Sequence, residues 1–337
     1  MERILIVRQQ NNQLGDLLCS LPLYYALKKK FPESEITLVA GKANYAIPYK
    51  KFCPYIDNII QMDRETLMKN ISFIREVRAL KCNIGIIPST MQFSRTSHVI
   101  NYLSGAKVRV GVKQFDNEVN KSAWLLNETG TFDWGKQKTH QTDRILDVAK
   151  IIGCELTDEE KIIRVTHTED VLKDANEFLR SNFPANTKII GMHTGAGKVA
   201  NRWDYRNFVS LAKRLKEKYN CVFLLTSGYI DKEVTEKTIQ GLKENDIPFV
   251  VENVEVRVLG AMLSMIDLYV TNDTGVMHLS GFSGGKVVSL FGPTRGYEWA
   301  PQQKGCRYIQ SKTGEINDIT VEEVMNVLVD SKRKDFR

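Results

Sequence analysis

The sequence predicts an α/β protein built from two parallel, doubly wound sheets, one in each half of the chain. Short apolar strands alternate with helices along most of the 337 residues, a pattern typical of parallel sheets. The alternation pauses at a solvated helix over 169–179 and a polar loop over 182–186, and then begins again. Polar and glycine-rich stretches follow several strands, at the edge where open α/β sheets bind ligands.

The first half begins with an apolar strand over 3–8, followed by a helix over 17–31. Lysines at 28–30 end this helix, where positive charge suits the helix dipole. Pro22 lies inside the helical pattern and indicates that the helix begins near it. Further strands are expected over 35–40, 58–62 and 83–87.

The second half repeats the pattern, with helices expected from Tyr205 and Val256. Its expected strands span 188–193, 221–226, 249–251, 266–271 and 287–291.

We therefore divide the chain into an N-terminal domain over 1–170 and a C-terminal domain over 171–319. A helix and tail follow over 320–337, with Thr320 as the expected N-cap of the helix. We expect this last segment to pack back on the N-terminal domain.

The composition is that of a globular protein, with 42% hydrophobic and 26% charged residues. No apolar run approaches the roughly 20 residues of a transmembrane helix. The N-terminus enters a strand directly, without the apolar stretch of a signal peptide, so we expect a cytoplasmic protein. The six cysteines lack metal-ligand spacing, which indicates reduced structural thiols and argues against zinc.

The net charge of +7 is concentrated in the first half of the chain. Up to residue 165 there are 24 Lys and Arg against 18 Asp and Glu, and after it 23 against 22. Basic clusters at 28–30 and 50–51 are either solvated helix faces or a surface that meets anionic lipid or an anionic acceptor. Nucleic acid is not an expected partner, because no nucleic-acid-binding motif accompanies the charge.

The first polar cluster, over 13–17, places Gly15 and Asp16 after the first strand. An aspartate at a helix start is commonly a cap. Its position at the carboxyl end of a strand is also compatible with a general base. Local sequence leaves both interpretations open.

The second cluster, over 193–204, combines small residues with Lys198 and Arg202 and precedes the helix from Tyr205, with Asp204 as its expected cap. Such a loop can present backbone N–H groups and a helix N-terminus to a diphosphate.

The cluster partly resembles two nucleotide-binding motifs, the P-loop and the dinucleotide fingerprint, but departs from both. The P-loop pattern fails because Val199 follows Gly197 and Lys198, and because Met192 stands where its first glycine belongs. The dinucleotide fingerprint G-x-G-x-x-A matches 195–200, but Asn-Arg-Trp-Asp separates it from the helix that it should open directly.

The third cluster, over 226–233, contains Asp231 and Glu233. Either acid can accept hydrogen bonds from ribose hydroxyls, or both can simply favour a helix start.

The fourth cluster, TNDTGVMHLSG over 271–281, lies between a strand and a helix. Asp273 can bind sugar hydroxyls there, and Thr274 and Gly275 offer donors at the mouth of the helix. His278, on the first turn, is either a packed or capping residue or a contact to phosphate or sugar.

The clusters resemble three motifs of glycosyltransferase family 9, the ADP-heptose:lipopolysaccharide heptosyltransferases. Residues 15–32 resemble its GD…P…AL…FP segment, 193–208 its PGAG…KxW…F segment, and 267–294 its AD, NDTGPMH and LFGPT run. The resemblance implies the GT-B fold, in which two Rossmann-like domains have the active site between them.

The resemblance also implies roles for individual residues. Asp16 matches the general base, which takes the proton from the acceptor hydroxyl. The lysine of KxW is Asn201 here, so its phosphate contact passes to Lys198 or Arg202, or is lost. The implied donor-binding residues are Thr194, Gly195, Lys198, Arg202, Asp231, Asp273, Thr274, Gly275 and His278.

The implied function is that of an inverting, metal-independent glycosyltransferase. It moves a sugar, heptose from ADP-heptose, onto a lipopolysaccharide core or related glycolipid. The chain has no DxD motif for Mg²⁺ or Mn²⁺, so neither a metal nor another cofactor is expected. We expect the basic N-terminal surface to contact anionic lipid on the inner face of the bacterial cytoplasmic membrane.

Three alternatives stay open at this point. The first is transfer of another nucleotide-activated sugar onto a surface glycan. The second is a nicotinamide-dependent oxidoreductase that uses the glycines of 195–200. The third is a non-catalytic sugar-nucleotide binder, against which the presence of Asp16 argues.

Overall fold

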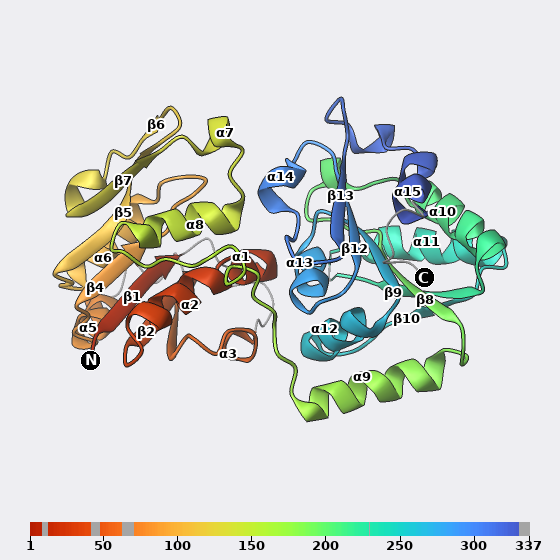
Figure 1. Cartoon of the computed structure of the whole chain (residues 1–337), viewed down its shortest axis with the longest axis horizontal. Coiled ribbons are helices and arrows are strands. Elements are labelled where there is room, and N and C mark those ends of the chain that lie inside the picture. Colours follow the sequence, from red (N-terminus) through yellow and green to blue (C-terminus); the bar gives the residue numbers. More distant parts are fainter. Residues whose placement is uncertain (9–12, 42–47, 63–70, 229, 330–337) are drawn as a thin grey trace. The chain divides into compact units, whose positions relative to one another are not determined.

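The computed structural model describes residues 1–8, 13–41, 48–62, 71–228 and 230–329 (Figure 1). The chain divides into two compact units, Met1–Ile163 and Arg164–Arg337. Each unit contains one sheet with helices packed around it, as the sequence predicts. The division lies at 163 and not at 170, because the N–H of Val165 already donates to the carbonyl oxygen of Phe282 in the second unit, at 2.8 Å.

The first unit has a seven-stranded sheet with the order β3-β2-β1-β4-β5-β6, and β7 also pairs with β5. All pairs are parallel except the short one between β5 and β6. The strand order reverses between β1 and β4, which places a topological switch point at the carboxyl end of β1. The strands are β1 Arg3–Arg8, β2 Glu35–Gly41, β3 Asn58–Met62, β4 Ile84–Ile87, β5 Val108–Phe115, β6 Glu118–Val119 and β7 Glu128–Phe132.

The helix predicted over 17–31 is two helices, separated at Ser20. Pro22 occupies the first turn of the second helix, where its missing N–H costs nothing. The helices of this unit are α1 Leu14–Cys19, α2 Leu21–Lys30, α3 Tyr49–Phe52, α5 Ile71–Ala79, α6 Arg95–Leu103, η1 Ala123–Leu125, α7 Trp134–Gln137 and α8 Gln141–Lys150.

The second unit has a six-stranded, all-parallel sheet with the order β10-β9-β8-β11-β12-β13. Its switch point lies between β8 and β11, where Thr271 pairs with His193. The second and fourth polar clusters therefore leave neighbouring strands. The strands are β8 Lys188–His193, β9 Cys221–Thr226, β10 Phe249–Val251, β11 Leu268–Asn272, β12 Val287–Phe291 and β13 Cys306–Gln310.

Helices surround this second sheet (Figure 1). The one from Tyr205 begins as predicted, because the side chain of Asp204 accepts from the N–H of Arg206 as its cap. The helices are α9 Glu169–Asn182, η2 Val199–Asn201, α10 Tyr205–Lys218, α11 Lys232–Glu244, α12 Val256–Met265, α13 Gly275–Phe282, α14 Gly296–Trp299, η3 Ile316–Asp318 and α15 Val321–Val329.

The last helix, α15, packs against α10 of the second unit. Thr320 and Glu323 form the predicted N-terminal cap reciprocally: each side chain accepts from the other residue's backbone N–H, at 3.1 and 2.8 Å. Val324 is fully buried in the same core as Phe208. The apolar face of α15 is thus used within the second unit. Residues 330–337 lie outside the described residues, and the packing of this segment on the N-terminal domain stays a prediction.

All six cysteines are free thiols, five of them buried and Cys306 half-buried. Burial raises the pKa of Cys53 and Cys306 to about 12. It raises the pKa of Cys82, Cys154 and Cys221 to about 11. These five thiols are therefore protonated and poorly nucleophilic at neutral pH.

Candidate functional site

Asp16 lies in the first turn of α1, beyond the carboxyl end of β1. The N-cap of this helix is Gln13, so Asp16 is not the capping residue. Its Oδ1 lies 4.0 Å from Nη2 of Arg8, a buried arginine that also donates to the hydroxyl of Ser20. Burial raises the pKa of Asp16, and the charge of Arg8 opposes that rise. A carboxylate with a raised pKa beside a fixed cation is suited to accept a proton.

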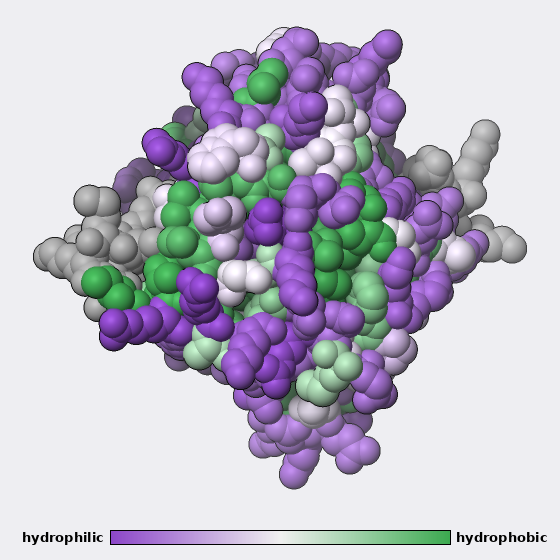
Figure 2. Space-filling model, turned by 90° about the vertical axis from the view of Figure 1, so that its left-hand side faces the viewer, coloured by the Kyte–Doolittle hydropathy of each residue, from purple (hydrophilic) through white to green (hydrophobic). Residues whose placement is uncertain are grey.

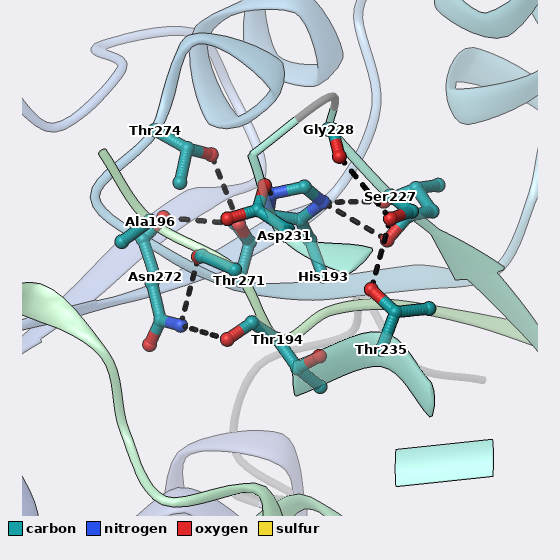
Figure 3. A network of polar contacts seen from close by, with 12 residues as sticks. His193, Thr194, Ala196, Ser227, Gly228, Asp231, Thr235, Thr271, Asn272 and Thr274 are labelled. Carbon is teal, nitrogen blue, oxygen red and sulfur yellow. Dashed lines mark hydrogen bonds and ion pairs between the residues drawn. The ribbon is translucent and has the colours of Figure 1, made fainter. Parts of the chain in front are cut away.

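We call residues 193–204 the donor loop, because the resemblance implies that they bind the donor. Asn272 at the end of β11 holds this loop (Figure 3). Nδ2 of Asn272 donates to the carbonyl oxygens of Thr194 and Gly195, at 3.1 and 3.0 Å. Its Oδ1 accepts from the N–H of Trp203 at 3.1 Å. One buried side-chain amide thus fixes both ends of the donor loop. The sequence analysis did not name Asn272 as a site residue, although it lies in the TNDTG stretch.

Trp203 anchors the far end of the donor loop. Its ring is fully buried and packs edge-on against Phe208, with ring centroids 5.0 Å apart. Its Nε1 donates to the carbonyl oxygen of Ile319 at 2.8 Å. Because the indole is both packed and hydrogen-bonded, the residues before it are held against the sheet.

A buried charge cluster lies beneath the donor loop (Figure 3). Nδ1 of His193 contacts Oγ1 of Thr226 at 2.9 Å, and its Nε2 lies 3.5 Å from Oδ2 of Asp231. Nη2 of Arg202 lies 3.5 Å from Oδ1 of Asp231, and its Nε donates to the carbonyl oxygen of Ala196. Burial raises the pKa of Asp231, but the hydrogen bond from His193 and the charges of His193 and Arg202 outweigh it and lower the pKa overall.

The carboxylate of Asp231 is covered by two glycines. A Cβ on Gly195 would lie 2.0 Å from its Cγ, and a Cβ on Gly228 would lie 2.5 Å from its Oδ2. The side chain is 4% exposed, so this geometry gives Asp231 a supporting role in place of the ribose contact implied by the resemblance. Glu233, the other acid of that cluster, is exposed and forms an ion pair with Lys237 at 2.6 Å.

Asn201, Asp273 and Thr294 form a second polar cluster at the same edge of the sheet. Nδ2 of Asn201 donates to Oγ1 of Thr294 at 2.9 Å and to Oδ2 of Asp273 at 3.3 Å. Asn201 is buried, yet its Oδ1 has no hydrogen-bond partner among the described residues. Burial raises the pKa of Asp273 to about 6, against the hydrogen bond with Thr294 and the charge of Lys198. The cluster therefore holds a buried acceptor without a described partner next to a carboxylate.

Lys198 and Arg202, the two predicted replacements for the family lysine, differ in their surroundings. Arg202 is engaged by Asp231 and by the carbonyl oxygen of Ala196. Lys198 is exposed, and its ammonium group forms no hydrogen bond or ion pair within the described ranges. The charge of Lys198 lowers the pKa of Asp273 and so opposes the effect of burial. Lys198 is thus the cation of the donor loop that is available to a ligand.

At the mouth of α13, Thr274 is the N-cap, and its Oγ1 accepts from the N–H of Met277 at 3.4 Å. Gly275 is the first helical residue. His278 is 3% exposed and packs edge-on against Trp299, which agrees with the packed alternative and not with a ligand contact. The N-terminus of α10, expected to face an anion, is occupied by the carboxylate of Asp204 and its ion pair with Arg206.

The structure brings the predicted donor residues together at one edge of the second sheet, whereas Asp16 lies in the first unit. Within the described ranges, no group of three or more His, Cys, Asp and Glu side chains is arranged to hold a metal ion. Metal independence stays a prediction.

Sequence comparison identifies the family of the chain. Residues 71–327 match the model of glycosyltransferase family 9 (heptosyltransferase). Lipooligosaccharide heptosyltransferase 2 of Campylobacter jejuni serotype O:2 is 24% identical over 300 residues, which cover 86% of this chain and 81% of that protein. A putative glycosyltransferase of Haemophilus influenzae is 22% identical over 310 residues, 89% of this chain and 86% of that protein.

Solved structures show the same fold. The family 9 glycosyl transferase of Veillonella parvula matches with a TM-score of 0.77 and 19% identity, over 96% of this chain and 95% of that one. E. coli ADP-heptose lps heptosyltransferase II matches with a TM-score of 0.74 and 20% identity, over 97% of each chain. E. coli heptosyltransferase WaaC with ADP-2-deoxy-2-fluoro heptose matches with a TM-score of 0.67 and 17% identity, over 97% of this chain and 99% of that one.

The family match covers most of the chain and includes the donor loop, its Asn272 anchor and the NDTG cluster. The nicotinamide alternative is replaced, because the glycines of 195–200 lead into the short η2 turn and not directly into a helix. The chain has the GT-B fold, is a glycosyltransferase, and belongs to glycosyltransferase family 9, the heptosyltransferases.

Proposed function

We propose that this protein is an inverting, metal-independent transferase that moves heptose from ADP-heptose onto a lipopolysaccharide core or related glycolipid. The observation that carries the proposal is the edge of the second sheet where, in a family 9 chain, Asn201 contacts Asp273 and the charge of Lys198 acts on the same carboxyl group. The E. coli structures with ADP and with an ADP-heptose analogue support the choice of nucleotide.

In the proposed donor site, Lys198 and the N-terminus of α13 face the diphosphate. Lys198 is the unengaged cation of the donor loop, and the α13 N-terminus is capped only by the neutral hydroxyl of Thr274. Backbone N–H groups and a neutral cap leave a helix N-terminus favourable to anions. Both groups stabilise the charge that grows on the leaving ADP.

Asn201 and Asp273 bind the transferred sugar in this proposal. The free Oδ1 of Asn201 and the carboxylate of Asp273 accept hydrogen bonds from sugar hydroxyls, and the amide of Asn201 is already directed to Asp273 and Thr294. Because Asn201 carries no charge, we assign it to the sugar. Lys198 is assigned to the phosphate, whose negative charge it neutralises. Arg202 holds the loop through Asp231.

Asp16 acts as the general base. Its carboxylate takes the proton of an acceptor hydroxyl, and the resulting oxygen attacks the anomeric carbon from the face opposite ADP. The C–O bond to the β-phosphate breaks through a transition state of oxocarbenium character, and ADP leaves with the bonding electron pair. Attack opposite the leaving group inverts the anomeric centre.

Because the acceptor proposed here is a glycolipid, we also propose that the enzyme works on the cytoplasmic side of the membrane as a peripheral protein. Among the described residues, none of the helices has the length and apolarity needed to cross a bilayer. Contact with the membrane therefore depends on a surface of the folded protein.

The first experiment is calorimetric binding of a nucleotide-sugar panel in EDTA, with ADP, GDP, UDP and NAD as further ligands. We expect selective binding of ADP and ADP-heptose without metal. Preference for another sugar nucleotide would keep the fold and mechanism but assign a different donor. Binding that requires Mg²⁺ or Mn²⁺ would contradict metal independence, and absence of binding to every sugar nucleotide would contradict the proposed function.

The non-catalytic alternative is tested by the transfer reaction itself. The bound donor is incubated with a lipopolysaccharide-core acceptor, and ADP release and product mass are measured. Tight donor binding without transfer to any core acceptor would favour the binder over the enzyme.

A further inference from the structure

The first unit carries exposed apolar side chains on adjoining elements. Trp124 of η1 is 77% exposed, Val119 of β6 is 61% exposed, and Tyr102 and Val99 of α6 are 50% and 37% exposed. Figure 2 views the molecule from the side on which α6 and β5–β7 lie in Figure 1, and shows apolar residues interspersed with hydrophilic ones. Large exposed apolar side chains gathered on one face mark interaction sites more often than isolated ones do.

Printed contacts join these elements into one surface. The guanidinium of Arg109 lies 5.4 Å from the ring centroid of Tyr102, and its Nε donates to the carbonyl oxygen of Leu125 in η1 at 2.7 Å. The ring of His98 in α6 contacts Nδ2 of Asn120, next to Val119, at 2.8 Å. We call Val99, Tyr102, Val119 and Trp124 the α6–η1 face.

The sequence segment that contains the α6–η1 face has a net positive charge. The segment 71–127 contains eight Lys and Arg against three Asp and Glu, a net +5 of the +7 of the whole chain. Arg95, Lys113 and Lys121 within it are exposed. Cations that surround aromatic and aliphatic side chains are complementary to a bilayer, whose headgroups are anionic and whose interior is apolar.

The lysines at 28–30, which the sequence suggested as the membrane contact, are engaged within the first unit. Lys28 Nζ lies 2.7 Å from Asp57 Oδ2, Lys29 Nζ lies 2.6 Å from Glu160 Oε1, and Lys30 Nζ donates to the carbonyl oxygen of Ile152 at 2.6 Å. The described part of this helix exposes no large apolar side chain. The lysines at 28–30 are thus partly neutralised by neighbouring groups. Among the described residues of the helix, no large exposed apolar side chain lies beside them that could insert into a bilayer.

We propose that the α6–η1 face docks on an anionic lipid bilayer, with Trp124 and Val119 inserted at the level of the headgroups. This inference rests on the proposed function, because a glycolipid acceptor would be presented at a membrane. It names a different surface from the lysines at 28–30. Trp and Tyr suit this position because their rings are apolar and their polar atoms stay at the water boundary.

The test is sedimentation of the full chain with vesicles of phosphatidylethanolamine and phosphatidylglycerol. We expect Val119→Ser with Trp124→Ser to lower the fraction bound at least tenfold. A matched variant, Val251→Ser with Met265→Ser, removes two exposed apolar side chains of the second unit and is expected to bind like the wild type. Equal loss in both variants, or no loss in the first, would overturn the proposal.

A fluorescence measurement locates the inserted side chain without a disruptive substitution. Trp134 and Trp203 are fully buried, and Trp299 is half-buried in the second unit. Brominated lipids are therefore expected to quench mainly Trp124, and Trp124→Phe is expected to lose this quenching while still binding the vesicles. Unchanged quenching in Trp124→Phe would contradict insertion at η1.

Two further outcomes separate this inference from its rivals. If wild-type protein forms a dimer that Trp124→Ser disperses, and binds no vesicles, the face is an interface between copies and the proposal fails. Transfer to a core acceptor without its lipid should have the wild-type rate in the Val119→Ser, Trp124→Ser variant. Loss of that reaction would overturn docking as the role of the face, whereas absence of transfer in the wild type would instead contradict the proposed function.

Discussion

Asp16 is the residue on which the proposed chemistry depends most directly. We expect Asp16→Asn to lower the transfer rate by about 10²–10⁴-fold, because the acceptor hydroxyl loses its base. Binding of ADP should be unchanged, since the donor residues lie in the other unit. Steady-state transfer and calorimetry check both parts, with the exposed Glu33→Gln as a control in the same unit.

Retained turnover in Asp16→Asn would remove Asp16 as the base. The pH dependence gives a second test. Burial raises the pKa of Asp16, so the deprotonated form needed for catalysis appears at a higher pH than for an exposed aspartate. We expect the transfer rate to rise with pH through that titration in the wild type and not in Asp16→Asn.

Asp273, which we propose to bind the sugar, is also expected to lower the stability of the fold. Its pKa of about 6 exceeds the ordinary 3.8, so between these values the folded state holds more protons than the unfolded state. Stability contributed by this group is therefore lost as pH rises from about 4 to about 6. We expect Asp273→Asn to raise the free energy of unfolding by about 3 kcal/mol at pH 7.5 and by much less at pH 4.5.

Urea unfolding at the two pH values measures this difference, and the exposed Asp174→Asn is the control. The same substitution should weaken binding of the sugar nucleotide more than binding of ADP, because a carboxylate that accepts sugar hydroxyls is lost. An equal effect on both ligands would assign Asp273 to the nucleotide and not to the sugar.

The donor loop provides the sharpest comparison at the scale of an element. Gly195 has the Asp231 carboxyl in the space of a Cβ, whereas Gly197 has no heavy atom within 4 Å of that position. We expect Gly195→Ala to displace the loop, lower the free energy of unfolding by roughly 1–3 kcal/mol and weaken donor binding at least tenfold. Gly197→Ala should change stability by less than about 0.5 kcal/mol.

Thermal unfolding and ADP binding of both variants check the comparison. Similar behaviour of the two alanines would show that contact with Asp231 does not fix the loop. The pairing of His193 with Asp231 would then need another explanation.

Sequence patterns predicted most of the parallel strands because buried strands are apolar runs between turns. The strands β5, β6, β7 and β13 were not predicted. Glu128–Phe132 reads ETGTF and is largely exposed, so it lacks the apolar pattern by which a strand is detected. The break in the first helix could be foreseen from Pro22, but its position at Ser20 could not.

Composition and position predicted that the proposed donor residues gather at one edge of the second sheet, but not the hydrogen bonds and ion pairs between them. Asp231 meets His193 because β8 and β9 are neighbours, which only the strand order shows. The same holds for Asn272 and the donor loop, which β8 and β11 bring together. His278 and the N-terminus of α10 were expected to face ligand, but Trp299 and Asp204 cover them.

At the scale of the whole molecule, the proposed donor residues and the proposed base belong to different units. Lys198, Asn201, Asp273 and Thr274 all lie in Arg164–Arg337. We expect this segment, expressed alone, to bind ADP within about tenfold of the full chain and to catalyse no transfer. Calorimetry and an ADP-release assay test this, and adding the separate first unit is the control for restored activity.

A folded second unit without ADP affinity would show that the first unit contributes to donor binding. The contrast in net charge between the halves also belongs to this scale. The excess of Lys and Arg lies in the half that contains Asp16 and the proposed membrane face, and not in the half that contains the proposed donor residues.

The separation of Asn272 from Asn201 has a consequence for how such an enzyme diversifies. Asn272 holds the backbone of the donor loop, and Asp231 pairs with its His193 and Arg202. Lys198 is exposed on the loop, and Asn201 contacts Asp273 and Thr294 instead of the residues that hold the loop. A lineage can therefore exchange Lys198 or Asn201 without removing the contacts that hold the loop. Changes of sugar preference are then accessible to drift and selection while the scaffold is inherited unchanged.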